Sequence, residues 1–400
     1  MSEKLTYSIV NKLSVYITAF IVVIDTAVII PILSLYALEL GASKPLIGLI
    51  VGIYAPADII FNFISGYLSD KIGRKRVFLI GMLIDATTMF LYSLCKDPIQ
   101  LLYVRVLHGC GSGLNMPSLL TISSEVVPRK RVAGGMSILG LIFALSFLIG
   151  IKSGGYISHL YGYNILFTSI SILLFILAIV GVFALPETYS RRELPKSLGS
   201  IVNRFKSELK LLFIPSLLVV YFAVFTRQFA RSVMTTLFPL FLAESWNVSI
   251  RQVRRLAGDL MSAPMYSYII FILFAGAIAD RKDKRITAFI GLLILSIFLL
   301  LIPSFTSEII LYPIMLTRGI GDALLFPSLT GLVALELASE RRGKGFGLYS
   351  GIETLASALG APICGLVASV IGTVNAIRIF FILPLLSAFL LLILYLKVRD

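Results

Sequence analysis

The chain has 400 residues, of which 58% are hydrophobic and only 14% are charged, and its mean hydropathy is +0.96. Soluble globular proteins carry about 25% charged residues, so this composition excludes a soluble domain. The formal net charge of +14 raises the question of a nucleic-acid partner, which the distribution of the basic residues answers below.

Apolar runs of about 20 residues recur along the whole chain, and each is long enough to cross a hydrocarbon core of about 30 Å. Because no water is present there to bind the backbone, each run is expected to be a helix. The sequence therefore predicts an all-α membrane protein with twelve spans, in chain order 13–38, 46–68, 77–95, 99–123, 133–157, 164–185, 212–242, 258–279, 287–304, 308–336, 345–370 and 375–396.

The basic residues between the spans predict the orientation. If both termini are cytoplasmic, 24 of the 35 Lys and Arg are cytoplasmic and 6 are on the other side. Such an excess is typical of cytoplasmic loops, so we expect a multi-pass protein of the cell membrane with both termini in the cytoplasm and no nucleic-acid partner. Arg251, Arg254 and Arg255 depart from the pattern. They form either a solvated loop face, the simpler interpretation, or a gate or an anionic lipid contact.

The two halves of the chain repeat each other. The longest non-apolar stretch predicts three parts: an N-terminal six-helix bundle at 1–186, a cytoplasmic linker at 187–210 and a C-terminal six-helix bundle at 211–400. At an offset of 210 residues, Gly66 and Asp70 align with Gly276 and Asp280. The same offset aligns Gly81 with Gly291, Gly109 with Gly319, Gly111 with Gly321 and Pro117 with Pro327. A constant offset over five helices indicates a duplication, and an even number of spans per half makes the repeat parallel.

Two motifs resemble those of the major facilitator superfamily. The segment Gly66 to Arg76, GYLSDKIGRKR, resembles its G-x-x-x-D-[RK]-x-G-R-[RK] loop between the second and third helices. Arg105 with the following HGCG is similar to its fourth-helix pattern R-x-x-x-G-x-G. The resemblance covers essentially the whole chain and implies two six-helix bundles that rock around a midplane site. Asp25 and Asp85 make the chain most similar to the twelve-span drug:proton antiporters of that superfamily, tetracycline exporters included.

The resemblance also implies a cytoplasmic latch between the two bundles. A basic loop accounts for the positive charge, but it does not account for Asp70 or its copy. We expect Gly66 and Gly276 to allow another helix to come close. By resemblance, Asp70 accepts from the helix N-terminus near Gly345, and Glu125 pairs with Arg74. The predicted latch residues are Gly66, Asp70, Gly73, Arg74, Glu125, Gly276 and Asp280.

Ionisable residues within the spans balance each other in number. They are Asp25, Asp58, Asp85, Asp322 and Glu353, with Arg105, Lys152, Arg227, Arg231 and Arg318. Each costs about 2.5–3.5 kcal/mol at the centre of a span and is expected to face the bundle interior or a cavity. Arg318 and Asp322 are four residues apart on one helix and are expected to pair. Arg227 and Arg231 have no local acid and are expected to face across the cavity.

A mid-span carboxyl group suits a proton carrier because burial raises the pKa of such a group toward neutrality. We rank Asp25 first for proton coupling, since no basic residue lies three or four positions away, then Asp85, then Asp58 and Glu353. The alternative for each is a neutral carboxyl group bonded to a neighbour. In the family the first, fourth, seventh and tenth spans line the cavity. This implies the charged lining Asp25, Arg105, Arg227, Arg231, Arg318 and Asp322.

The fifth span resembles the antiporter signature G-x-x-x-G-P-x-x-G-G only in part. The segment SFLIGIKSGG, residues 146–155, still contains glycines, which permit close packing of helices, but has Ile151 where proline is expected. Lys152 follows and is interpreted as a substrate contact or an ion-pair residue.

These observations predict a secondary active transporter without a cofactor, driven by the proton gradient, that exports a hydrophobic or amphipathic small molecule. The alternatives are an importer or uniporter of an organic anion, and a lipid transporter or flippase on the same scaffold. The sequence does not favour an enzyme or an ATP-driven pump. It has no phosphate-binding loop motif, and its two histidines, His108 and His159, have no histidine or carboxylate at ligand or dyad spacing along the chain. The expected partners are the substrate and membrane lipids, and a monomer is the family's usual state.

Overall fold

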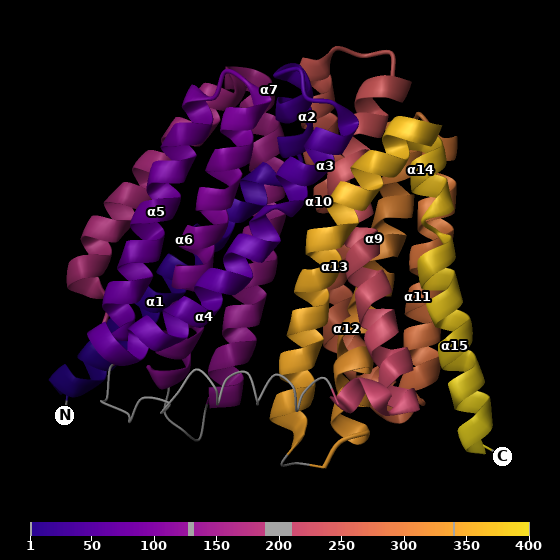
Figure 1. Ribbon diagram of the computed structural model, residues 1–400. Helices are drawn as coiled ribbons and strands as arrows, with labels where there is room; N and C mark the ends of the chain where they lie inside the picture. The colour runs from indigo at the N-terminus through magenta and orange to yellow at the C-terminus, as the bar shows by residue number, and fades with distance from the viewer. Residues whose placement is uncertain (1, 127–131, 189–209, 339–340, 400) are drawn as a thin grey trace. The chain divides into compact units, whose positions relative to one another are not determined.

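The computed structural model describes residues 2–126, 132–188, 210–338 and 341–399. Most of the predicted linker 187–210 therefore lies outside the described residues. The described chain is helical throughout (Figure 1). Its elements are α1 (Ser2–Ile29), α2 (Leu33–Glu39), α3 (Lys44–Gly52), α4 (Tyr54–Ile72), α5 (Arg74–Leu94), α6 (Pro98–Glu125), α7 (Val132–Ala184), η2 (Lys210–Phe213), α9 (Pro215–Ser245), α10 (Ile250–Arg281), α11 (Lys284–Leu301), η3 (Ile302–Ser304), α12 (Glu308–Leu335), α13 (Arg342–Ile371), α14 (Thr373–Ile379) and α15 (Ile382–Arg399).

The twelve predicted spans correspond to these helices. Within the described residues, 10 helical segments are long and apolar enough to cross a membrane. One of them, Ile138–Ala184, has 47 residues and holds two spans, because Gly162 breaks the helix with a φ of 84°. The helix α6 falls outside this set of segments because its middle is rich in glycine and polar residues, but its 28 residues are long enough for a span. The prediction of an all-α protein with twelve membrane helices is confirmed.

Some boundaries differ from the prediction for local reasons. The first span is interrupted after Ile29 and resumes at Leu33, because Pro31 has no backbone N–H to continue the helix. The eighth span was predicted to begin at residue 258, whereas α10 begins at Ile250. Its arginine-rich start, which was predicted as a loop, is helical and continuous with the rest of the span.

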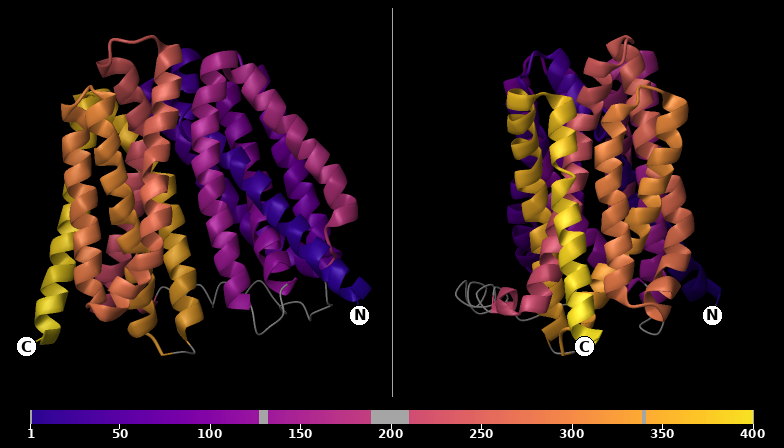
Figure 2. Two further views of the ribbon diagram at one scale, coloured as in Figure 1. Left: turned by 180° about the vertical axis from the view of Figure 1, so that it is seen from behind. Right: turned by 90° about the vertical axis from the view of Figure 1, so that its right-hand side faces the viewer.

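The chain forms two compact units. Unit 1 comprises Met1–Ala42, Leu49–Leu194 and Ile250–Asp259, and unit 2 comprises Ser43–Gly48, Pro195–Ser249 and Leu260–Asp400. These units differ from the predicted bundles at two short segments, 43–48 and 250–259. In unit 1, α1 packs against α7 and α6 packs against α4 and α5. In unit 2, α9 packs against α13, and α11 packs against α12 and α15. Within each unit the long helices run alongside one another (Figure 2).

Glycine contacts recur at matching positions of the two halves. A Cβ on Gly109 of α6 would lie 2.5 Å from the Tyr54 carbonyl oxygen of α4. A Cβ on the repeat partner, Gly319 of α12, would overlap the Pro264 carbonyl oxygen of α10. Such approaches let helix backbones pack directly where no hydrophobic force drives them together. Large apolar side chains, such as Phe183 and Ile309, are instead exposed, as lipid-facing positions require.

Candidate functional site

Three buried side chains from three helices converge in unit 1. Asp25 of α1, Asp85 of α5 and His108 of α6 are at most 1% exposed. One ligand-type atom from each lies within 4.8 Å of the other two, and His108 Nε2 is 3.9 Å from Asp25 Oδ2. We call these three residues the acidic cluster. The first two were the leading proton-coupling candidates, and the structure brings them together.

His108 corrects the sequence analysis. The chain has no carboxylate near His108 in sequence, so spacing along the chain gives this histidine no partner. The structure supplies two carboxylates from other helices. The sequence held a partial signal, because His108 is three residues after the buried Arg105, and Arg105 Nη1 lies 3.2 Å from His108 Nδ1. Residues three apart share a helix face, so the argument that placed Arg105 inside the bundle applied to His108 as well.

Two tyrosines and Arg105 surround the acidic cluster. The Arg105 guanidinium lies over the Tyr54 ring, 4.3 Å from its centroid, an arrangement that stabilises a cation in an apolar setting. The Tyr92 hydroxyl lies 3.3 Å from His108 Nδ1. Asp58, on the same helix as Tyr54, is only half-buried and accepts from Asn62 Nδ2 at 2.8 Å. Asp58 is thus a neighbour of the cluster and not one of its three converging groups.

A second charged group lies in unit 2 around Arg227. Its Nη1 is 3.1 Å from Glu353 Oε1 and its Nε is 3.9 Å from Asp322 Oδ1. The expected local pair is confirmed, since Arg318 Nη2 is 3.6 Å from Asp322 Oδ2. Arg227 therefore has two acids from neighbouring helices of its own unit. Arg231 is exposed and has no ion-pair partner recorded among the described residues.

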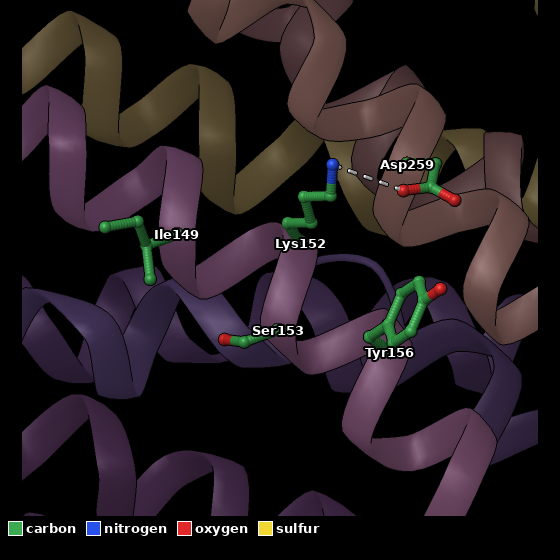
Figure 3. A pocket seen from close by; sticks show the side chains of 5 residues that line it. All are labelled: Ile149, Lys152, Ser153, Tyr156 and Asp259. Carbon is green, nitrogen blue, oxygen red and sulfur yellow. Dashed lines mark ion pairs between the residues drawn. The ribbon is translucent and has the colours of Figure 1, made fainter.

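Lys152 lines a pocket in unit 1. Its Nζ is 3.9 Å from Asp259 Oδ1, which confirms the ion-pair interpretation of this residue. The pocket has a volume of about 440 Å³ and is lined by Ile149, Lys152, Ser153, Tyr156 and Asp259 (Figure 3). The four α7 residues recur at the spacing of one helix face. Gly150 and Gly154 lie on the face of α7 that packs against Ala27 and Val28 of α1.

Arg251, Arg254 and Arg255 lie on the first turns of the helix α10 and not in a loop. Arg254 Nη2 is 2.5 Å from Glu39 Oε2, and the side chain of Arg254 is only 11% exposed. Its guanidinium also lies 3.9 Å from the centroid of the Tyr163 ring. Arg251 donates to the carbonyl oxygens of His159 and Leu160 at 2.6 and 2.8 Å. The simpler interpretation is therefore wrong for Arg254, which is not solvated and binds Glu39 of α2. Arg251 is exposed and binds α7, and Arg255 pairs with Asp259 of its own helix at 3.5 Å.

The structure shows one of the predicted latch contacts and does not show or does not test the others. Arg74 and Glu125 form the predicted ion pair. The close approach expected at Gly66 and Gly276 is not seen, since a Cβ at either would meet nothing within 4 Å among the described atoms. Asp70 and Gly345 belong to different units, so their contact stays a prediction. The side chain of Asp280 lies outside the described part of the chain.

Gly73 shows a role that the sequence did not indicate. It joins α4 to α5 with a φ of 98° and ψ of 150°, a backbone conformation that suits glycine. Glycine has no side chain to cap α5, and Glu187 supplies the cap instead: the Arg74 backbone N–H donates to its Oε1 at 3.1 Å. The first residue of the predicted linker is therefore part of unit 1.

This cap leads to a testable expectation. Changing Glu187→Ala removes the acceptor from the start of α5 and is expected to lower the free energy of unfolding by about 1 kcal/mol. Thermal unfolding of the purified protein in detergent measures the effect. Glu187→Gln keeps an acceptor and should retain most of the stability, and a loss as large as that of Glu187→Ala would contradict capping by a hydrogen bond.

Known proteins resemble this chain over most of its length. A model of the Major Facilitator Superfamily matches residues 15–230 and 220–400. An uncharacterized MFS-type transporter of Methanocaldococcus jannaschii is 23% identical over 378 residues, covering 91% of this chain and 93% of that protein. The quinolone resistance protein NorA of Staphylococcus aureus strain COL is 23% identical over 357 residues, 88% of each chain. A crystal structure of the nucleoside transporter NupG shares the fold with a TM-score of 0.81, at 16% identity, and covers 95% of this chain and 98% of that one.

Proposed function

The chain belongs to the major facilitator superfamily and is a multi-pass membrane transporter, and from this we propose that it exports a hydrophobic or amphipathic small molecule in exchange for protons. The observation that carries the proposal is the acidic cluster, in which Asp25 and Asp85 are buried and lie within 4.8 Å of each other and of His108. Carboxyl groups inside a membrane protein are costly and are typical of proton pathways. Asp25 is the principal coupling residue.

Export is supported by the relative whose name states a function. NorA is described as a quinolone resistance protein, and removal of a drug from the cell is one route to resistance. An inward proton crossing about 100 mV releases about 2.3 kcal/mol, against about 1.4 kcal/mol for each tenfold gradient. One proton per cycle is therefore sufficient to sustain a solute gradient of more than tenfold.

Purified protein in proteoliposomes tests the proposal. Vesicles with an acidic interior and an enclosed pH dye receive ethidium or norfloxacin outside, and exchange is expected to move protons out as the compound enters. Asp25→Asn is expected to abolish the proton movement, since an amide cannot carry a proton. Asp283→Asn is the matched control, because Asp283 is exposed at the start of α11 and asparagine also caps a helix.

The outcomes separate the candidates. Proton movement that depends on the compound and is lost only in Asp25→Asn supports exchange. If the flux of either compound through the wild type does not depend on the pH gradient, exchange with protons would be overturned. Movement of a fluorescent phospholipid between leaflets, with no flux of ethidium or norfloxacin, would instead indicate a lipid transporter.

A second candidate, an importer or uniporter of an organic anion, rests on Arg231, which is exposed and has no recorded ion-pair partner among the described residues. Two other cations of the membrane helices are less available to an anionic substrate. Arg227 faces Asp322 and Glu353, and Lys152 faces Asp259. Counterflow of benzoate or a similar aromatic carboxylate, reduced in Arg231→Gln, would favour this candidate over export.

A further inference from the structure

The acidic cluster contains polar atoms with no hydrogen-bond partner among the described residues. Asp25 Oδ2, Asp85 Oδ1 and His108 Nε2 are all in this state, and all three side chains are buried. Groups in this state cost free energy unless something satisfies them. A metal ion or a bound proton would satisfy such groups.

The second oxygen of each carboxylate is already bonded. Thr26 Oγ1 donates to Asp25 Oδ1 at 2.9 Å, and Asn115 Nδ2 donates to Asp85 Oδ2. Each carboxylate is thus held by one donor and directs its other oxygen into the cluster. Gly111 leaves space for this arrangement, because a Cβ there would overlap Asp85 Oδ1.

The neighbours of His108 determine which ring nitrogen carries the proton. Arg105 Nη1 lies 3.2 Å from Nδ1, and a guanidinium has only donors. Nδ1 must therefore present its lone pair, which leaves the proton of the neutral ring on Nε2. The Tyr92 hydroxyl lies 3.3 Å from the same Nδ1 and can donate to it. A second ring proton on Nδ1 would point at the guanidinium, so this site also opposes the imidazolium form.

This tautomer does not suit a metal ion. A metal at Nε2 needs the lone pair there and a proton on Nδ1, which metal-bound histidines normally donate to a carboxylate or carbonyl oxygen. Here the neighbour of Nδ1 is the Arg105 guanidinium, which is a donor and a cation. The cluster is therefore arranged for a proton.

We propose that Asp25 and Asp85 share one proton, and that His108 is a positioning residue held as the neutral Nε2–H tautomer by Arg105. This deepens the proposed function and rests on it. Two carboxylates within 4.8 Å of each other repel when both are charged. One shared proton leaves a single negative charge to balance Arg105. The His108 N–H lies 3.9 Å from Asp25 Oδ2 in this structure. When the shared proton leaves, this N–H stabilises the negative charge of the Asp25 carboxylate.

The charged and titratable groups around Asp25 and Asp85 come from three helices. Tyr54 and Asp58 lie on α4, Tyr92 on α5 and Arg105 on α6, beside the three cluster residues themselves. The helix α7, which packs against α1, directs Lys152 to Asp259 instead. Arg105 is therefore the one cation recorded at the cluster among the described residues.

Nitrogen NMR tests the tautomer without any transport. The chain has two histidines, so His159→Gln leaves His108 as the only histidine in protein labelled with ¹⁵N-histidine and placed in lipid nanodiscs. The expected spectrum is that of a neutral Nε2–H ring between pH 5 and pH 8, a range that extends about 1.5 units on each side of the ordinary histidine pKa. An imidazolium at pH 5, or a neutral Nδ1–H ring, would overturn the assignment of His108.

Infrared spectroscopy of the same samples tests the shared proton. The carbonyl-stretch band of the protonated carboxyl group is expected to be lost or displaced in both Asp25→Asn and Asp85→Asn. A band that only one of the two variants changes would place the proton on that residue alone. Addition of Co²⁺ should give no visible absorption from a bound ion, and such absorption, lost in His108→Gln, would establish a metal site.

Exchange measurements then test the positioning role. His108→Gln keeps an N–H at a similar reach and is expected to keep the pH profile of ethidium–proton exchange. His108→Leu removes the N–H that faces Asp25 Oδ2 at 3.9 Å, so the Asp25 carboxylate loses stabilisation and the profile should move about one pH unit or more to the alkaline side. Equal profiles in the two variants would overturn the role. If the wild type shows no exchange while the spectra are as expected, the proposed function fails and the proton assignment stands.

Discussion

Valine at position 319 is expected to prevent the protein from accumulating in a folded form. A Cβ on Gly319 of α12 would overlap the Pro264 carbonyl oxygen and the Ser267 Oγ of α10. A backbone carbonyl cannot rotate aside as a side chain can, so the two helices must separate. Overpacking a core costs 1–3 kcal/mol in ordinary cases, and we expect about 3 kcal/mol or more here. Gly109→Val should act in the same way, because its Cβ would lie 2.5 Å from the Tyr54 carbonyl oxygen.

Fluorescence-detected size-exclusion chromatography of detergent extracts measures this loss. Gly66→Val and Gly140→Val are matched controls within helices, since a Cβ at either position meets nothing within 4 Å among the described residues. Replacing a helical glycine by valine is slightly favourable on propensity alone, so both controls should accumulate as the wild type does. Normal accumulation of Gly319→Val would mean that α10 and α12 do not pack as closely as the structure indicates.

Arg227→Met is expected to lower the free energy of unfolding by about 3 kcal/mol. Removing one partner of a buried ion pair costs about 3–5 kcal/mol, because the remaining charge is buried without compensation. The low end of the range applies here, since the Glu353 side chain is 31% exposed and Asp322 keeps Arg318 at 3.6 Å. Urea or thermal unfolding in detergent provides the measurement.

Two variants sharpen this test. Arg231→Met changes an exposed residue on the same helix and should alter stability by no more than about 0.5 kcal/mol. The double variant Arg227→Met with Glu353→Gln should recover part of the loss, because it removes the charge that was left unpaired. Additive losses in the double variant would show that the Arg227–Glu353 contact does not stabilise unit 2.

The membrane helices could be predicted because their cause is local. A run of apolar residues long enough to cross the bilayer has to be helical, whatever packs against it. The errors are local too: Pro31 interrupts the first span, and the arginine-rich start of α10 was mistaken for a loop. The Arg318–Asp322 pair was predictable for the same reason, since both residues lie on one helix.

The contacts of the candidate site could be predicted only in part. The free-energy cost of a charge in the membrane predicts that Asp25, Asp85 and Arg105 lie inside the bundle, and the structure confirms that they are buried. That cost does not identify His108 as the neighbour of both acids. Close packing was predicted at Gly66 from its repetition in the second half, but its surroundings are open in the described residues. Repetition of a glycine does not by itself tell which helix face it occupies.

The sequence by itself determined the number and kind of helices, the duplication of the two halves and the family, because these follow from the length, polarity and spacing of residues along the chain. Only the tertiary structure decided which side chains meet. The approach of His108 to Asp25 and Asp85, the cap that Glu187 gives α5 and the binding of Arg254 to Glu39 join residues far apart in the chain. Such contacts depend on how each helix is rotated and where it crosses its neighbours, and the packing of whole helices sets both.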